Sequence, residues 1–379
     1  MIFGIQMKSL IILSIIMLLA FFLVWMCFIS SDTTIGIPLR LSPNITPSSS
    51  FIQHLGKRLD RKIAILVVSD TPDRLKEYEW AQKTLNCYAS LQNYTMKYIF
   101  MSHDPLLDKA CNQTDLMFKR HCTTVEFMKT NPQYEWILFL DGDIGVINPR
   151  RRIEEYIYED PFVDLVFYDR MYNFEIMAGS YLARNTEYAR GFLRYWADYF
   201  YSLPNSFHGT DNGAIQEIFM HKFATKEQID RCDKIYFTSK NYDTLWQFEA
   251  CARDALGIDR RIFISIDGYV KILAKGKAWA RDGGENITPF WANRDFMFHG
   301  WKNNKMDVLG QGRDSWIFPF VSKSAYNGSI CAPESDAEYV IKFNWAYKPE
   351  LVRTDAEIET ILRRKIQNVH KDYLNNLKR

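Results

Sequence analysis

The chain of 379 residues is 47% hydrophobic and 24% charged, which is the composition of a globular protein with one large core or two modest ones. Its formal net charge is only +2, which excludes the strong attraction to phosphate backbones that drives general nucleic-acid binding. No nucleic-acid polymer is therefore expected among its partners. The sequence contains no internal repeat and no long tract of low complexity.

An uncharged apolar run near the N-terminus is long enough to cross a bilayer, which takes about 20 such residues. Lys8 precedes the run and Asp32 follows it, so the positive-inside rule places the N-terminus in the cytoplasm and the bulk of the chain in the lumen. A cleaved signal peptide is the alternative, although its apolar region is typically shorter, ~7–15 residues. The sequence thus predicts a single-pass type II protein of the Golgi or ER membrane, with a cytoplasmic tail (1–8), a transmembrane signal-anchor (9–30) and a stem rich in Pro and Ser (31–60).

Two further patterns agree with a lumenal location. Five Asn-x-Ser/Thr sequons occur, at Asn44, Asn93, Asn112, Asn286 and Asn327. An even number of cysteines follows the membrane segment: Cys87, Cys111, Cys122, Cys232, Cys251 and Cys331. They are compatible with disulfides in an oxidising compartment, with 15 connectivities open, or with buried free thiols.

Strands and helices alternate along the domain predicted for residues 61–320. Strands are expected at 63–68, 96–102, 136–147, 164–170 and 180–185, and helices at 73–92, 113–130, 149–159 and 186–203. Irregular strands follow at 260–270 and 295–305, and a C-terminal extension (321–379) ends in a helix. This alternation predicts an α/β fold with a mostly parallel sheet covered by helices on both faces, preceded by the single membrane helix.

Acidic residues stand at the predicted strand ends. Asp70, Asp141, Asp143 and Asp169 each lie at or just beyond the end of an apolar strand. Ligands of parallel sheets bind outside the carboxyl ends of the strands, so these carboxylates are expected to converge on one crevice.

The stretch WILFLDGDIGVI places Asp141 and Asp143 directly after a core strand, with Gly142 between them. Burying two carboxylates is costly unless a cation pairs with them. Because glycine lets the backbone turn, both can face one hard divalent ion such as Mg²⁺ or Mn²⁺, which commonly takes substrate phosphates as further ligands. The alternative is a turn or an Asx cap at the strand end.

Two later segments carry further site candidates. In FMFHGWK, His299 is either a packed core histidine or the third metal ligand, while Gly300 and Lys302 suit a diphosphate. In NSFHGTDNGAIQEIF, Asp211 is either a helix N-cap or part of a site loop.

The segments PQYEWILFLDGDIGVINP, EIMAGSYLARNTEYARGFLRYWAD, DNGA and HGWK occur in the order found in DxD sugar-nucleotide glycosyltransferases with the GT-A fold. Over residues 61–305 the chain resembles the retaining α-galactosyl-, α-mannosyl- and xyloglucan xylosyltransferase family. It is also similar to an uncharacterised nematode family with the same layout. Asn212 stands where the transferase family shows Gln, and Ala178 where it shows Thr, so the resemblance leaves the donor sugar open.

The resemblance implies a role for each matching residue. Asp141 and Asp143 would hold Mn²⁺ (or Mg²⁺) on the diphosphate of a UDP-sugar or GDP-sugar, with His299 as a further ligand and Lys302, beside Gly300, neutralising the leaving group. The nucleotide pocket would be lined by Ile65, Val67, Ser69 and Asp70. The donor sugar would be contacted by Gly179, Ser180 and Asp211. The carboxylates that stabilise an oxocarbenium-like state would be those of Asp211 and Glu175.

The function expected on this basis is Mn-dependent, retaining transfer of a sugar to a glycan or glycoprotein acceptor. Two alternatives stand beside it. A phosphatase of the haloacid dehalogenase type also uses hydrophobic-Asp-x-Asp, but that motif normally opens its domain, whereas about 75 residues of βα structure precede it here. A lumenal binding or structural protein on an inactive transferase scaffold is the other alternative.

Overall fold

The computed structural model describes residues 62–157, 161–284, 287–307 and 315–378. The tail, membrane anchor and stem expected over residues 1–60 lie outside these ranges. No helix within the described residues is both long enough and apolar enough to span a bilayer.

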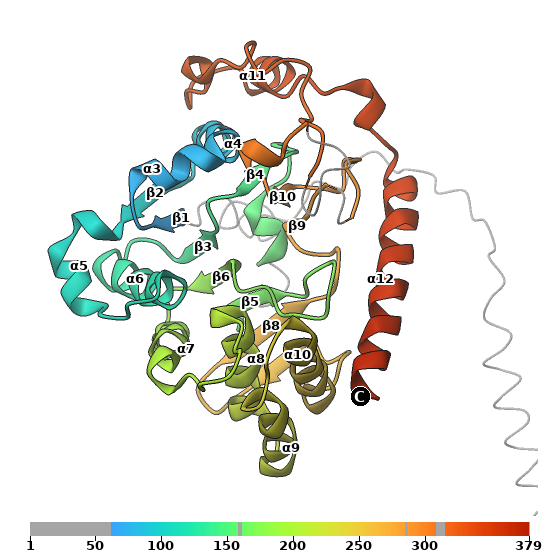
Figure 1. Cartoon of the computed structure of the whole chain (residues 1–379). Helices are drawn as coiled ribbons and strands as arrows, with labels where there is room; N and C mark the ends of the chain where they lie inside the picture. The colour runs from blue at the N-terminus through green and yellow to red at the C-terminus, as the bar shows by residue number, and fades with distance from the viewer. Residues whose placement is uncertain (1–61, 158–160, 285–286, 308–314, 379) are drawn as a thin grey trace, which may run out of the picture. The chain divides into compact units, whose positions relative to one another are not determined.

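A seven-stranded mixed sheet of order β2–β1–β3–β6–β5–β8–β7 forms the centre of the fold (Figure 1). Five strands run in one direction, whereas β6 and β7 run antiparallel to their neighbours, so the sheet is mostly parallel as the alternation predicts. The strands are β1 (Ile63–Ser69), β2 (Thr95–Phe100), β3 (Trp136–Leu140), β5 (Leu165–Tyr168), β6 (Ser180–Arg184), β7 (Ile262–Ile264) and β8 (Tyr269–Leu273).

Both faces of this sheet are buried, and this explains why the sequences of its central strands are unbroken apolar runs. Alternate residues of β1 enter two different cores: Ile65 and Val67 pack on one side, and Leu66 and Val68 on the other. The first core includes α4 (Glu79–Leu91). The second contains α6 (Leu116–Thr130), α7 (Glu187–Asp198), α8 (Thr210–Phe223) and α10 (Tyr242–Leu256).

The remaining α-helices among the described residues are α3 (Pro72–Leu75), α5 (Pro105–Ala110), α9 (Lys226–Tyr236), α11 (Ala337–Asn344) and α12 (Asp355–Leu377). The helix expected at 149–159 is reduced, within the described residues, to a 3₁₀ turn over Ile153–Tyr156. Tertiary contacts override helix propensity there, because Glu154 accepts a hydrogen bond from Tyr94 and Arg152 donates to Gln92 at 2.6 Å.

A second, three-stranded sheet builds the corner beside the end of β3. It has the order β4–β10–β9, formed by β4 (Ile144–Val146), β10 (Met297–His299) and β9 (Ala280–Asp282). Antiparallel pairing of β10 with β4 sets His299 opposite Ile144, and parallel pairing with β9 sets it beside Asp282. Residues far apart in sequence therefore meet next to the Asp141–Asp143 turn.

The described residues of the C-terminal extension belong to the same compact unit as the sheet. Val340, Trp345 and Leu351 are buried in the core that contains α4. All six cysteines expected in the lumen form disulfides, which settles the choice between disulfides and free thiols: Cys87–Cys331, Cys111–Cys122 and Cys232–Cys251.

Candidate metal centre and its cavity

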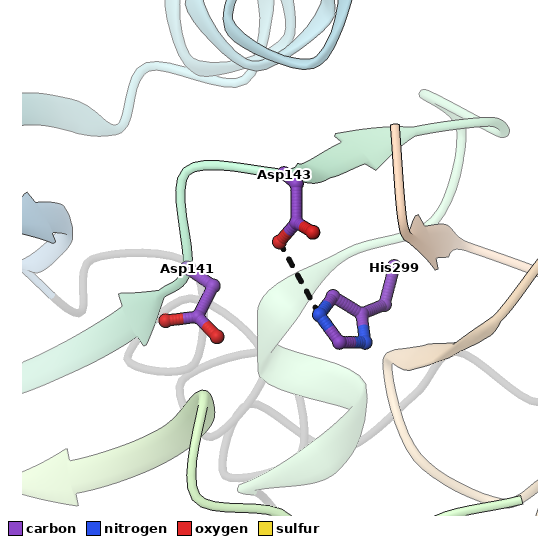
Figure 2. Close-up of side chains that lie close together, drawn as sticks. All are labelled: Asp141, Asp143 and His299. Atoms are coloured by element: carbon purple, nitrogen blue, oxygen red, sulfur yellow. Dashed lines mark ion pairs between the residues drawn. The ribbon is translucent and has the colours of Figure 1, made fainter. Parts of the chain in front are cut away.

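Asp141 and Asp143 lie in the turn that leaves β3 and enters β4 (Figure 2). The Asp141 N–H donates to the Gly179 carbonyl at 2.8 Å, and the Ile144 N–H donates to the Asp141 carbonyl at 3.1 Å. A Cβ on residue 179 would stand 2.0 Å from Asp141 Oδ2, so only glycine leaves room for this carboxylate. The backbone thus fixes both carboxylates at one corner.

The neighbouring strand brings His299 to this corner. The N–H groups of Gly300 and Trp301 donate to the Asp143 carbonyl at 3.0 and 2.9 Å. Gly300 has a φ of 104°, a conformation that side-chain-bearing residues rarely adopt. As Figure 2 shows, the His299 ring points at the Asp143 carboxylate, and its Nε2 lies 3.2 Å from Asp143 Oδ1.

The charges at this corner stabilise one another. Burial alone lowers the pKa of His299, but the carboxylates of Asp143 and Asp282 raise it to about 10. Burial likewise opposes ionisation of Asp143, yet His299 lowers the pKa of Asp143 to about 2. Burial raises the pKa of Asp141, against the opposing effect of Arg120.

An outer layer of ion pairs orients His299. Its Nδ1 lies 3.0 Å from Asp282 Oδ1, which leaves Nε2 facing Asp143. Arg170 holds Asp282 in turn at 3.3 Å, and it also pairs with Glu175 at 3.2 Å. A carboxylate behind a ligating histidine fixes the ring and its tautomer, as is usual at protein metal sites.

Behind Asp141 lies a second network, formed by α6 and α8. Arg120 pairs with Asp141 and, at 2.6 Å, with Asp211. His121 Nε2 lies 3.1 Å from the same Asp211 oxygen, and the imidazole stacks on Trp196 at 3.5 Å between ring centroids. Burial opposes ionisation of Asp211, but Arg120 and His121 outweigh it and hold its pKa below the ordinary value.

A cavity of about 300 Å³ opens over these groups. The charged side chains on its wall are Arg74, Arg120, Asp141, Asp143, Arg170, His299 and Lys302. Lys302 Nζ lies 3.7 Å from Asp143 Oδ2, and its side chain is 38% exposed, so it can turn toward a ligand. Because positive groups outnumber the two carboxylates, the cavity suits an anion that arrives with a metal.

The cavity contains only part of the expected nucleotide pocket. Ser69 lines it, whereas Asp70 lines an adjacent cavity of about 220 Å³ together with Arg74. A pocket role for Ile65 and Val67 does not fit their placement, because both side chains are buried in the core beneath β1.

Four expected site residues are buried in the framework instead. Ser180 donates to the Phe139 carbonyl and accepts from Trp279, so its hydroxyl is not available to a sugar. Asp211 is fully buried and is not the N-cap of α8, which is Gly209. Glu175 is buried against Arg170, and Asp169 pairs with Arg253 and Arg261 away from the crevice.

The sequence reasoning missed four residues of this site. Arg74 lies in α3, Arg120 is placed by α6, Arg170 lies two residues beyond β5, and Asp282 ends β9. The available signal was positional: Arg170 adjoins Asp169, which was already recognised at a strand end. Arg120 and Asp282 are brought to the site only by pairing between segments far apart in the chain, so the local sequence gives no signal for them.

The residues present fit a divalent metal ion. The ligand atoms of Asp141, Asp143 and His299 all lie within 4.8 Å of one another. Carboxylate oxygens with one imidazole nitrogen suit Mn²⁺, and the Asp282 contact supplies the outer partner that such a histidine needs.

The described chain is thus a mixed α/β protein with a carboxylate–histidine centre at the wall of a cation-rich cavity. Residues 85–313 match the family described as "protein of unknown function, DUF273", and the chain belongs to this family. No curated protein matches the chain.

Two solved structures are similar to parts of the chain. One is a glycosyltransferase involved in the glycosylation of the major capsid of PBCV-1, with 19% identity, a TM-score of 0.34, and coverage of 43% of this chain and 76% of that chain. The other is A197 from STIV, with 12% identity, a TM-score of 0.22, and coverage of 35% of this chain and 66% of that chain. Likenesses at these TM-scores carry no conclusion about function.

Proposed function

We propose that this chain is a metal-dependent glycosyltransferase of the GT-A type, which moves a sugar from a UDP-sugar or GDP-sugar to a glycan or glycoprotein acceptor. One observation carries the proposal. Asp141 and Asp143, recognised in sequence as a DxD motif, lie with His299 and Lys302 on the wall of a single cavity. The order of motifs that resembles the transferase family supports the same assignment.

Each side chain at the cavity has a task in this chemistry. Breaking a sugar–diphosphate bond builds negative charge on the leaving phosphate, and bound Mn²⁺ or Mg²⁺ would supply Lewis-acid stabilisation of that charge. Lys302, whose side chain is 38% exposed, and Arg74 both line the cavity and can approach the same phosphates. Asp282 keeps Nε2 of His299 directed at the centre, and Arg120 keeps the Asp141 carboxylate in place.

The residues that we assign to the sugar of the donor differ from those that the sequence predicts. Since Asp211 and Glu175 are buried in ion pairs, we assign them to positioning Arg120 and Arg170 rather than to contact with substrate. Asn212, next along α8, lines the cavity and is the group that can reach a donor sugar. Retention of configuration stays an implication of the family resemblance.

The proposed location is the lumen of the Golgi or ER, with the N-terminal segment as a type II membrane anchor. Three disulfides support an oxidising compartment. The described sequon residues Asn93, Asn112 and Asn327 are all exposed, as glycosylation requires.

The test uses the full chain purified in detergent and a panel of UDP- and GDP-sugars. One nucleotide sugar is expected to raise the unfolding midpoint only when Mn²⁺ is present, because a ligand bound to the folded state alone stabilises it, by about 2.7 kcal/mol at 100 times its dissociation constant. Asp143→Ala is expected to abolish this shift and to lower sugar release by a factor on the order of 10²–10³.

The control variant is Asp259→Ala, which removes an exposed carboxylate on the chain's surface and should behave as wild type. A donor-induced shift that persists in Asp143→Ala would refute the metal centre. Release of inorganic phosphate from a phosphate monoester, lost in Asp141→Asn, would instead favour the phosphatase. A folded chain that binds no nucleotide sugar with or without Mn²⁺ would favour the binding or structural protein.

A further inference from the structure

A second cluster of metal-binding residue types lies on the helical side of the molecule. Glu217 and His221 stand four residues apart on one face of α8, and Asp233 faces them from α9. Their ligand atoms lie within 4.8 Å of one another, which is also true of the Asp141–Asp143–His299 centre. None of the three residues lines the cavity over that centre.

Glu217 is the unusual member of this cluster, because its side chain is 0% exposed. Neither of its carboxylate oxygens has a hydrogen-bond partner among the described residues, and the same holds for Asp233 Oδ1. His221 Nε2 approaches Glu217 Oε1 to 2.9 Å without the alignment of a hydrogen bond. Buried carboxylates are rarely left in this state, since each unsatisfied group costs about 1–3 kcal/mol.

The cluster crowds two carboxyl groups against one imidazole. His221 is 34% exposed at its side chain, which gives an ion a path from solvent to the buried oxygens. A divalent cation would give the buried oxygens of Glu217 a partner and would pair with both carboxyl groups at once.

We propose that Glu217, His221 and Asp233 form a second binding site, for a divalent transition metal ion. The imidazole ligand favours Zn²⁺ and its neighbours over Ca²⁺ and Mg²⁺, which prefer oxygen alone. Three protein ligands leave one tetrahedral position for water. The ion joins α8 to α9, and the Cys232–Cys251 disulfide, beside Asp233, joins α9 to α10. An ion bound there would hold these helices together, away from the cavity over the first centre.

The test measures Zn²⁺ binding in the Asp143→Ala background of the full chain, in which the first centre is broken. After treatment with a chelator and dialysis, this protein is expected to bind one Zn²⁺ per chain by calorimetry and to show a raised unfolding midpoint. Adding His221→Gln is expected to weaken binding by more than about tenfold, since even loss of an outer-shell partner costs about 10–100-fold at metal sites.

Two further variants keep the test decisive. Asp233→Asn preserves the shape of the side chain and so covers the case in which His221→Gln does not fold; it should also weaken Zn²⁺ binding. His370→Gln removes an exposed histidine of α12 and should leave binding unchanged. No Zn²⁺ bound in the Asp143→Ala background, or equal binding after His221→Gln or Asp233→Asn, would overturn the second site and leave the first untouched.

Discussion

The corner that holds His299 and the helix contact that holds His121 both bury an imidazole beside a carboxylate, yet with opposite results. His299 has a carboxylate on each ring nitrogen, and its pKa is raised to about 10. His121 is desolvated and shares Asp211 with Arg120, and its pKa is lowered to about 4. The difference lies in the partners of each ring: two carboxylates hold a proton on His299, whereas burial and the neighbouring Arg120 keep His121 neutral as part of the supporting network.

The largest effect is expected from breaking the supporting region. Arg120→Ala leaves the buried Asp211 carboxylate and Asp141 without their shared cation. Loss of one partner from a buried pair costs about 3–5 kcal/mol, which urea unfolding would detect as a lower midpoint. Lys226→Ala, which breaks the exposed pair with Asp230, is the matched control and should cost less than about 1 kcal/mol. Equal losses in the two variants would contradict the supporting role.

The second effect concerns pH and sharpens the contrast between the two histidines. The folded-state pKa of His121 is about 4, below its ordinary value of 6.5, so the unfolded chain binds a proton first as the pH falls. The associated stability is complete above about pH 6.5 and is lost on acidification toward pH 4, by about 3 kcal/mol in all. His299 adds little slope below about pH 5.5, where it is protonated in both states; above about pH 6.5 the unfolded chain loses this proton first, so the stability that His299 contributes falls as the pH rises toward 10.

The measurement compares wild type with His121→Gln from pH 4 to 7, so that the other titrating groups cancel. The groups facing His121 are Arg120 on its own helix, Asp211 of α8, Tyr181 of β6 and Trp196 of α7. The variant should be less dependent on pH across this window. Parallel curves would show that His121 does not remain neutral in the fold.

The smallest effect is expected in the outer layer of the metal centre. Asp282→Asn removes the negative charge behind His299 Nδ1 but keeps the size of the side chain. Mn²⁺ affinity, measured by calorimetry, is expected to fall by about 10–100-fold. The unfolding midpoint is expected to fall as well, because Arg170 also loses a buried anionic partner. Asp259→Asn, an exposed change, serves as the reference. Unchanged Mn²⁺ affinity would show that Asp282 does not support metal binding by His299.

The sequence anticipated much of the fold, and the three ligands that it predicts lie within 4.8 Å of one another. Apolar runs bounded by polar residues predicted β1, β3, β5 and β6, because a strand buried on both faces must be apolar throughout. Asp141 and Asp143 were detectable because two carboxylates interrupt such a run. The expected helix at 149–159 was wrong over its described part, since contacts of Glu154 and Arg152 with distant residues decide that segment.

Residue pattern alone therefore determined the central strands β1, β3, β5 and β6. It also determined that six cysteines follow the apolar N-terminal run, and which side chains carry groups that can bind a metal ion. Only the tertiary structure decided which of those side chains face the cavity. Ser180, Asp211 and Glu175 carry suitable groups but are directed into the framework, whereas Arg120, Arg170 and Asp282 are brought to the site. The physical reason is that a residue's type fixes its chemistry, while its exposure and its partners depend on pairing between segments far apart in the chain, such as β4 with β10.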